Sequence, residues 1–317
     1  SAGRSQQGAR AVAVGYQAGN TSQGLYATAV GGAAGQTSQG TYAVAVGHVA
    51  GQTSQGLYST AVGIQAGQSN QGNSATAVGH VAGQTSQGLY STAVGYTAGQ
   101  TSQGANSTAI GPNSGRDFQG DQSVAVGYGA GMTSQGTQAT AIGNIAGQYN
   151  QGNYCTAVGY YAGQTDQREN ATAVGRFAGG VSQGQTAVAV GLNAAWSNQG
   201  SAAVAVGEAA GNIRQGQYGI SVGARAGEFN QAANAIAVGY QAGGLSQQTN
   251  TVAIGTYAGE RSQKVEGVAI GYFAGYSNQG LYSTALGVAS GRHNQGQNAV
   301  AVGSGAGETN QSVGAVA

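Results

Sequence analysis

The sequence predicts an all-β protein, a parallel β-solenoid (β-roll) of about twenty coils, each sixteen residues long. Three observations lead to this prediction. A glycine, called here the anchor glycine, recurs every sixteen residues from Gly15 to Gly303 without insertion or deletion. Valine, isoleucine and threonine keep a fixed phase before it, and a glutamine stands eight residues after it in every copy. A fixed short period of this kind is the sequence signature of a solenoid.

The composition fits one elongated repeat domain over residues 1–317 and argues against several other classes of protein. Glycine accounts for 61 of 317 residues, but there is only one proline and no Gly-X-Y triplet, so the chain is not collagen. Charged residues are 6% of the chain and the net charge is +1. This balance gives no electrostatic reason to expect nucleic acid or an anionic membrane as a partner. No apolar run reaches the length of a membrane span, so we expect no membrane insertion.

The residues before each anchor glycine predict a strand. Alternate residues of a strand face opposite sides, so one face carries Ala or Ser and the other carries Thr or Val. Neither face is charged, and a strand of this kind is usually buried on both sides. We therefore expect one face to line the solenoid and the other to be covered by a second chain, which small residues let approach closely. The predicted packing face consists of Ala29, Ala45, Ala61, Ala77, Ala93 and Ala141.

The second half of each coil predicts a corner followed by a polar segment. An Ala-Gly pair such as Ala34-Gly35 supplies positive φ or close backbone approach at the corner. Three mostly polar residues then lead to the constant glutamine. If coils stack about 4.8 Å apart, the side-chain amides of this column can form a hydrogen-bonded ladder along the axis. The ladder is expected at Gln23, Gln39, Gln55, Gln71, Gln87, Gln103, Gln135, Gln151, Gln199 and Gln279.

The residues that usually carry chemistry are scattered. His48 and His80 share a phase but lie two coils apart, about 9.6 Å at strand spacing, which is too far for one zinc ion. Cys155 stands where other repeats have Ala or Ser, and no histidine shares its phase. The carboxylates suggest neither a catalytic pair nor a calcium site. We therefore expect no enzyme, no metal site and no cofactor.

Two kinds of surface column are candidates for binding. Tyrosines precede the predicted strand, and they either shield the solenoid edge or form a stripe that binds sugar or a host surface; they are Tyr26, Tyr42, Tyr58, Tyr90, Tyr154, Tyr218 and Tyr282. Threonines recur in the polar segment at Thr21, Thr37, Thr53, Thr85 and Thr101. A flat threonine array can match ice, although later copies replace these threonines with charged and aromatic residues.

The unit A-T-A-V-G-x-x-A-G, as it stands in Ala75–Gly83, resembles the head repeats of YadA-like trimeric autotransporter adhesins. Similar Gly/Ala/Gln repeats also occur in viral and phage fibre proteins. The resemblance implies a left-handed parallel β-roll with three chains packed around an axis. This sequence differs in its longer, sixteen-residue period and in its constant glutamine.

The sequence therefore predicts a structural protein: a self-assembling extracellular fibre or filament on a cell or virion surface. Neither end resembles a capping repeat, so copies are expected to pack side by side and also end to end. The alternative is a trimeric adhesin head that binds host matrix or glycan, and a minor alternative is an ice-binding protein. A charge on the predicted packing face, as in Ala141→Asp, is expected to block assembly.

Overall fold

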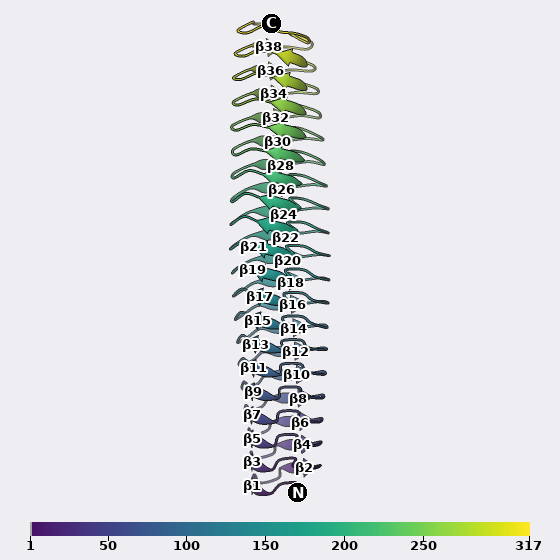
Figure 1. Ribbon diagram of the computed structural model, residues 1–317, viewed down its shortest axis with the longest axis vertical. Coiled ribbons are helices and arrows are strands. Elements are labelled where there is room, and N and C mark those ends of the chain that lie inside the picture. Colours follow the sequence, from purple (N-terminus) through teal and green to yellow (C-terminus); the bar gives the residue numbers. More distant parts are fainter. Residues whose placement is uncertain (1) are drawn as a thin grey trace. The chain divides into compact units, whose positions relative to one another are not determined.

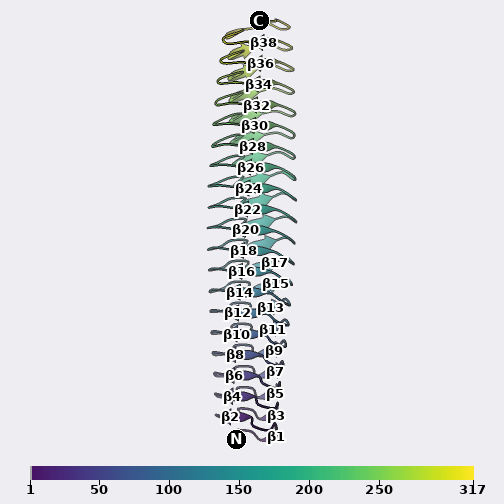
Figure 2. The same ribbon diagram turned by 180° about the vertical axis from the view of Figure 1, so that it is seen from behind.

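The computed structural model describes residues 2–317 as short strands joined by turns (Figures 1 and 2). The chain divides into two compact units, Ser1–Val158 (unit 1) and Gly159–Ala317 (unit 2). Each unit is a parallel β-solenoid built from the same sixteen-residue coil, with two three-residue strands per coil. The thirty-eight strands correspond to about nineteen coils. The predicted all-β parallel β-solenoid is confirmed.

The odd-numbered strands end in the constant glutamine and form what we call the glutamine sheet of each unit. In unit 1 they are β1 (Ser5–Gln7), β3 (Thr21–Gln23), β5 (Thr37–Gln39), β7 (Thr53–Gln55), β9 (Ser69–Gln71), β11 (Thr85–Gln87), β13 (Thr101–Gln103), β15 (Asp117–Gln119), β17 (Thr133–Gln135) and β19 (Tyr149–Gln151). In unit 2 they are β21 (Thr165–Gln167), β23 (Val181–Gln183), β25 (Ser197–Gln199), β27 (Ile213–Gln215), β29 (Phe229–Gln231), β31 (Leu245–Gln247), β33 (Arg261–Gln263), β35 (Ser277–Gln279) and β37 (His293–Gln295).

The even-numbered strands precede the anchor glycine and form the alanine sheet of each unit. In unit 1 they are β2 (Val12–Val14), β4 (Thr28–Val30), β6 (Val44–Val46), β8 (Thr60–Val62), β10 (Thr76–Val78), β12 (Thr92–Val94), β14 (Thr108–Ile110), β16 (Val124–Val126), β18 (Thr140–Ile142) and β20 (Thr156–Val158). In unit 2 they are β22 (Thr172–Val174), β24 (Val188–Val190), β26 (Val204–Val206), β28 (Ile220–Val222), β30 (Ile236–Val238), β32 (Val252–Ile254), β34 (Val268–Ile270), β36 (Thr284–Leu286) and β38 (Val300–Val302).

Successive coils pair in register, so equivalent residues stack along each sheet. Ala29 pairs with Ala45 in the alanine sheet, and Gln39 pairs with Gln55 in the glutamine sheet. Main-chain hydrogen bonds join each coil to both neighbours. The N–H of Thr37 donates to the carbonyl of Gln52 at 2.8 Å, while the N–H of Gly31 donates back to Val14 at 2.8 Å. Each column of side chains is therefore fixed by the register of the backbone.

The interior of each coil is filled by alanine. Ala27, Ala29 and Ala34 are fully buried, and their equivalents recur through both units. The coil is thin, since a Cβ atom placed on Gly35 would lie 3.2 Å from the Cβ of Ala29 across the interior. Cys155 occupies one of these alanine positions and is also buried. Serine and threonine also occupy these positions, as at Ser59 and Thr251, so the interior holds small side chains only.

The valine or isoleucine before each anchor glycine lies on the outer face of its strand and not in the solenoid interior. These residues, which we call the valine column, point out of the solenoid and are half-buried or exposed; Val14 is 56% exposed and Ile142 is 41% exposed. Strand alternation turns alanine inward and valine outward, and the thin interior accepts only small side chains at the alanine positions. The alanine sheet therefore presents an apolar outer surface in each unit.

The predicted packing face is wrong for the same reason. Its residues are fully buried inside their own coil and no second chain can reach them; they are Ala29, Ala45, Ala61, Ala77, Ala93 and Ala141. An aspartate at Ala141 would enter the solenoid interior, so it would disrupt the fold and not only an assembly. If a second chain covers the alanine sheet, it must contact the threonine, valine and isoleucine side chains.

The backbone bends repeatedly through the left-handed region. In the coil that follows Gly31, residues Ala33, Gly35, Ser38 and Tyr42 have φ between 51° and 59°, and Gly31 itself has φ 133°. Even β-branched residues such as Val49 and Ile145 take φ near 60°, which is locally unfavourable for them. Hydrogen bonds between coils and the buried interior must offset this cost, so the coil conformation depends on stacking.

Gly31 and Gly32 provide a matched test of the close contact between coils. A Cβ atom on Gly31 would overlap the carbonyl oxygen of Gly47, whereas one on Gly32 would meet only the movable ring of His48 at 3.3 Å. Gly31→Ala is expected to destabilise the fold by about 2–4 kcal/mol, because the backbone strain of an alanine at positive φ adds to the steric overlap with Gly47. Gly32→Ala should be neutral or stabilising by about 0.5 kcal/mol. Thermal and urea unfolding midpoints measure both, and equal losses would contradict the assignment.

Candidate functional site

The constant glutamines form the largest buried polar feature, which we call the glutamine column. The ten predicted ladder residues are at most 3% exposed. In each of them Nε2 donates to the main-chain carbonyl eleven residues earlier, at 2.6–2.9 Å, as from Gln39 to Thr28 and from Gln87 to Thr76. A second bond often reaches a carbonyl four residues later in the same coil, as from Gln39 to Ala43 at 3.3 Å. The side chain therefore links the two sheets across the interior.

Axial hydrogen bonds between glutamines, the predicted ladder, are present in segments of this column. Gln71 donates to Gln87 at 3.1 Å and Gln135 to Gln151 at 3.2 Å in unit 1, and Gln199 donates to Gln215 at 3.0 Å in unit 2. Elsewhere the buried Oε1 has no partner, as at Gln23, Gln39, Gln55, Gln103 and Gln279. The main chain is thus the more regular partner of the amides.

A second glutamine ladder lies outside the interior and was not predicted. Along this outer glutamine column, each Nε2 donates to the Oε1 of the preceding coil at 2.9–3.2 Å; its members are Gln36, Gln52, Gln68, Gln84 and Gln100. These residues are the first of the three polar residues after the Ala-Gly corner. Their shared phase was the signal in the sequence that could have revealed the ladder.

The tyrosines before the alanine sheet stack where they occur in successive coils. The rings of Tyr26 and Tyr42 lie 4.9 Å apart and nearly parallel, and those of Tyr42 and Tyr58 lie 5.3 Å apart. All three are exposed, and the guanidinium of Arg10 lies over Tyr26, 5.5 Å from the ring centroid. The column therefore combines edge shielding with an exposed aromatic surface.

Unit 2 carries a cluster of aromatic and basic side chains near its outer surface. Tyr257 stacks on Phe273 at 4.8 Å, and Tyr276 meets Phe273 edge-on at 5.0 Å. The guanidinium of Arg292 lies over Phe273, 4.8 Å from the ring centroid. Burial, together with a hydrogen bond to Glu260, raises the pKa of the Tyr276 hydroxyl, so this tyrosine stays protonated at neutral pH.

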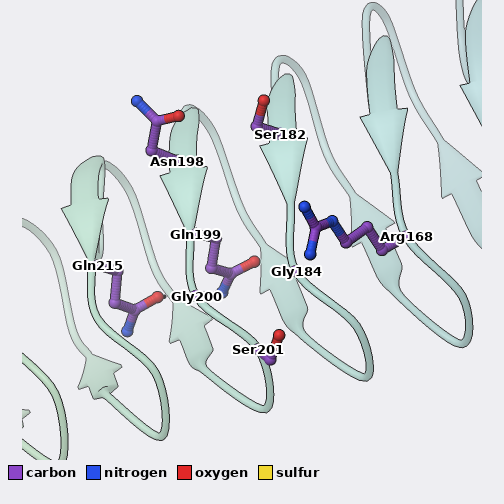
Figure 3. Close-up of a pocket in the computed structure, with 8 residues that line it drawn as sticks. All are labelled: Arg168, Ser182, Gly184, Asn198, Gln199, Gly200, Ser201 and Gln215. Carbon is purple, nitrogen blue, oxygen red and sulfur yellow. Dashed lines mark hydrogen bonds between the residues drawn. The ribbon is translucent and has the colours of Figure 1, made fainter.

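Figure 3 shows a shallow pocket of about 250 Å³ in unit 2. Arg168, which replaces the usual glycine of its corner, extends over the neighbouring coil. The other lining residues are Ser182, Gly184, Asn198, Gln199, Gly200, Ser201 and Gln215. Gln199 and Gln215 belong to the glutamine column, and the labelled side chains do not converge on one point (Figure 3). The pocket shows no arrangement of nucleophile, base and oxyanion donor.

Residues 2–317 show neither a cluster of metal-ligating side chains nor a membrane-spanning helix. No group of three or more His, Cys, Asp or Glu side chains is placed to hold a metal ion there. The same residues contain no helix of the length and hydropathy that a membrane span requires. Burial raises the pKa of the Glu228 carboxyl, and the positive charge of the nearby Arg225 offsets part of this rise.

The comparison with protein families identifies one segment. The family model of the YadA head domain repeat matches residues 86–114 in two copies. This segment contains β12, β13 and β14 of unit 1 and the anchor glycines Gly95 and Gly111. The resemblance to YadA-like head repeats is therefore confirmed for these coils, and such repeats occur in surface-exposed adhesins. No curated protein matches the chain.

The role of the glutamine column can be tested with a nearly isosteric change. Gln87→Glu would place a carboxylate oxygen against the carbonyl of Thr76, and we expect a loss of about 3 kcal/mol at pH 7. The folded state would raise the pKa of this carboxyl above its unfolded value of about 4.3, so stability should recover as the pH falls toward that value.

Gln84→Glu is the matched control, because Gln84 lies in the outer glutamine column and is only half-buried. It should cost about 1 kcal/mol or less and show little pH dependence. Urea unfolding of both variants between pH 4 and pH 8 measures the difference. A Gln87→Glu protein as stable at pH 8 as the wild type would show that the buried amide is dispensable.

Proposed function

We propose that the chain is an adhesin-like structural protein of a cell or virion surface, whose solenoids associate laterally through the outer face of the alanine sheet. The observation that carries this proposal is the outward-facing valine column, whose side chains are half-buried or exposed. It combines with the half-buried threonines and valines two residues earlier into an apolar surface on strands of each unit. A parallel sheet with two apolar faces is normally covered on both sides. The match of residues 86–114 to the YadA head repeat supports a surface role.

The charge distribution also favours association. Between Arg10 and Arg116 the sequence contains no Lys, Arg, Asp or Glu, so no like charges oppose the approach of a second copy in this part of the chain. An exposed apolar surface on stacked strands is a liability for a free monomer and suits a protein–protein contact. The partner that fits best is a second copy of the chain, since its alanine sheet offers the same neutral surface.

Lateral packing of this kind serves either a fibre or a trimeric head, and both are structural rather than enzymatic roles. Stacking of copies end to end stays a prediction. Electron microscopy of the purified protein distinguishes the two forms, because a fibre would exceed the length of one chain and a head would not. If the protein is an adhesin head, it would also bind host matrix or glycan. A pocket in unit 2 is a candidate site for such a ligand.

Two matched substitutions test the lateral contact. Ile142→Glu puts a charge on the valine column, whereas Ile64→Glu puts it on a similarly exposed isoleucine one residue after an anchor glycine. We expect Ile142→Glu to raise the concentration needed for association at least about tenfold, because it would bury a carboxylate without a partner. Ile64→Glu should associate like the wild type, and neither change should alter the unfolding midpoint by much.

Analytical ultracentrifugation over a concentration series measures association, and Ala141→Asp, whose side chain would enter the interior, serves as the unfolded reference. A wild-type protein that remains monomeric at every concentration would refute lateral self-association. Equal effects of Ile142→Glu and Ile64→Glu would place the contact elsewhere on the solenoid.

A further inference from the structure

Unit 2 contains a pocket of about 300 Å³ that none of the columns described above explains. It is lined by Phe177, Asn193, Trp196 and Asn212. These residues come from three successive coils, those that follow Gly175, Gly191 and Gly207. The pocket therefore exists only when three coils stack in register. Its lining combines two aromatic rings with two neutral carboxamides and includes no charged side chain.

Trp196 owes its position to a glycine in the preceding coil. A Cβ atom on Gly180 would lie 2.9 Å from Cδ1 and 3.2 Å from Nε1 of the indole, so the ring rests directly against the bare backbone of Gly180. Trp196 remains 42% exposed, and Asn212 follows it at the same phase of the next coil. Equivalent positions in other coils carry glutamine, as at Gln84 and Gln100. Gly180 and Trp196 therefore stand where two successive coils elsewhere carry stacked glutamines, and they provide a flat indole surface in their place.

The carboxamides supply the polar half of the pocket. Oδ1 of Asn212 is buried and has no hydrogen-bond partner. A buried acceptor without a donor is costly, so a ligand hydroxyl that gains access to Oδ1 when the Asn212 side chain turns toward the pocket removes a penalty present in the free protein. Each carboxamide also offers two N–H donors, which match groups that both donate and accept.

We propose that this pocket binds one neutral pyranose unit of a glycan. A pyranose has an apolar face of C–H bonds that packs on the indole, and a rim of hydroxyl groups that donate to and accept from the two carboxamides. The pocket volume suits one sugar ring with a few waters. A purely apolar ligand would leave Asn212 Oδ1 unpaired. The lining includes no cation, and the nearby guanidinium of Arg176 is already stacked on Phe177, 5.1 Å from the ring centroid. The inference rests on the proposed surface role, for which it names a ligand class.

The single tryptophan of the chain is the reporter for the test. Purified wild-type protein is titrated with the methyl glycosides of glucose, galactose, mannose and N-acetylglucosamine, and its tryptophan emission is recorded. At least one glycoside should shift the emission with a Kd of about 1 mM, the affinity expected for a ligand of this size. Methyl glucuronide, which carries a carboxylate, should bind at least about tenfold more weakly than the neutral sugar.

Two variants at equivalent positions sharpen the result. Gly180→Gln restores the residue common in this column and pushes the indole off the backbone, so it should weaken binding at least about tenfold while the fold is kept. Gly244→Gln makes the same change four coils further along, outside the pocket, and should bind like the wild type. Unfolding midpoints of both variants confirm that the comparison is between folded proteins.

Three outcomes would overturn the proposal. One is the absence of any emission change with all four neutral glycosides up to about 100 mM, a hundredfold above the expected Kd. Another is unchanged binding by Gly180→Gln, and the third is binding of a proline-rich peptide without binding of sugar. Ile142→Glu separates this question from self-association, because it should lose association and keep sugar binding. The sugar-binding proposal can therefore be refuted while lateral association is supported, and lateral association can be refuted while sugar binding is supported.

Discussion

The contact on which the rest of the structure depends is the approach of backbone to backbone in successive coils. At the anchor glycines the next coil lies where a Cβ atom would be; the space beside Gly15 is taken by the carbonyl of Gly31 at 2.6 Å. This approach keeps the spacing of coils uniform and the period at sixteen residues. Since the period is fixed, every side chain stacks on its equivalent, and the glutamine, tyrosine and valine columns follow.

The second glycine corner, which follows the constant glutamine, is equally close but less strict. A Cβ atom on Gly40 would lie 2.5 Å from the carbonyl of Gly56, yet Arg168, Gln248 and Lys264 occupy this position in unit 2. The main-chain bond from this residue to the next coil is 2.8 Å at Gly40 but 3.0 Å at Gln248 and 3.2 Å at Lys264. Alanine is admitted without this change, since the bond of Ala232 to Gln247 is 2.8 Å, so the lengthening accompanies the long side chains only.

The sequence was sufficient to predict the period, the parallel register and the position of the constant glutamine, because these follow from spacing. It did not show which face of the strand turns inward. Alternation separates Ala29 from Val30 but does not say which lines the interior, and the width of the coil decides it. Left-handed φ at Val49 contradicts local preference and is a consequence of stacking. The pocket of Trp196 requires side chains from three coils, so its shape could not be predicted. The sixteen-residue spacing of Gly180 and Trp196 did indicate that the two residues stack.

The axial direction of the hydrogen bonds has a mechanical consequence. Within a unit, we call the contact between two neighbouring coils a junction. The hydrogen bonds of one junction share a force along the stack, and every junction bears the same total force. The junction with the longest bonds therefore opens first. In unit 2 the coil of Lys264 has two such bonds of 3.2 Å, one from Lys264 to Gln279 in the next coil and one from Glu266 to Thr249 in the preceding coil. Each opened coil would release about 50 Å of chain. A protein built this way lengthens in uniform steps under load, and the sixteen-residue coil becomes its unit of extension.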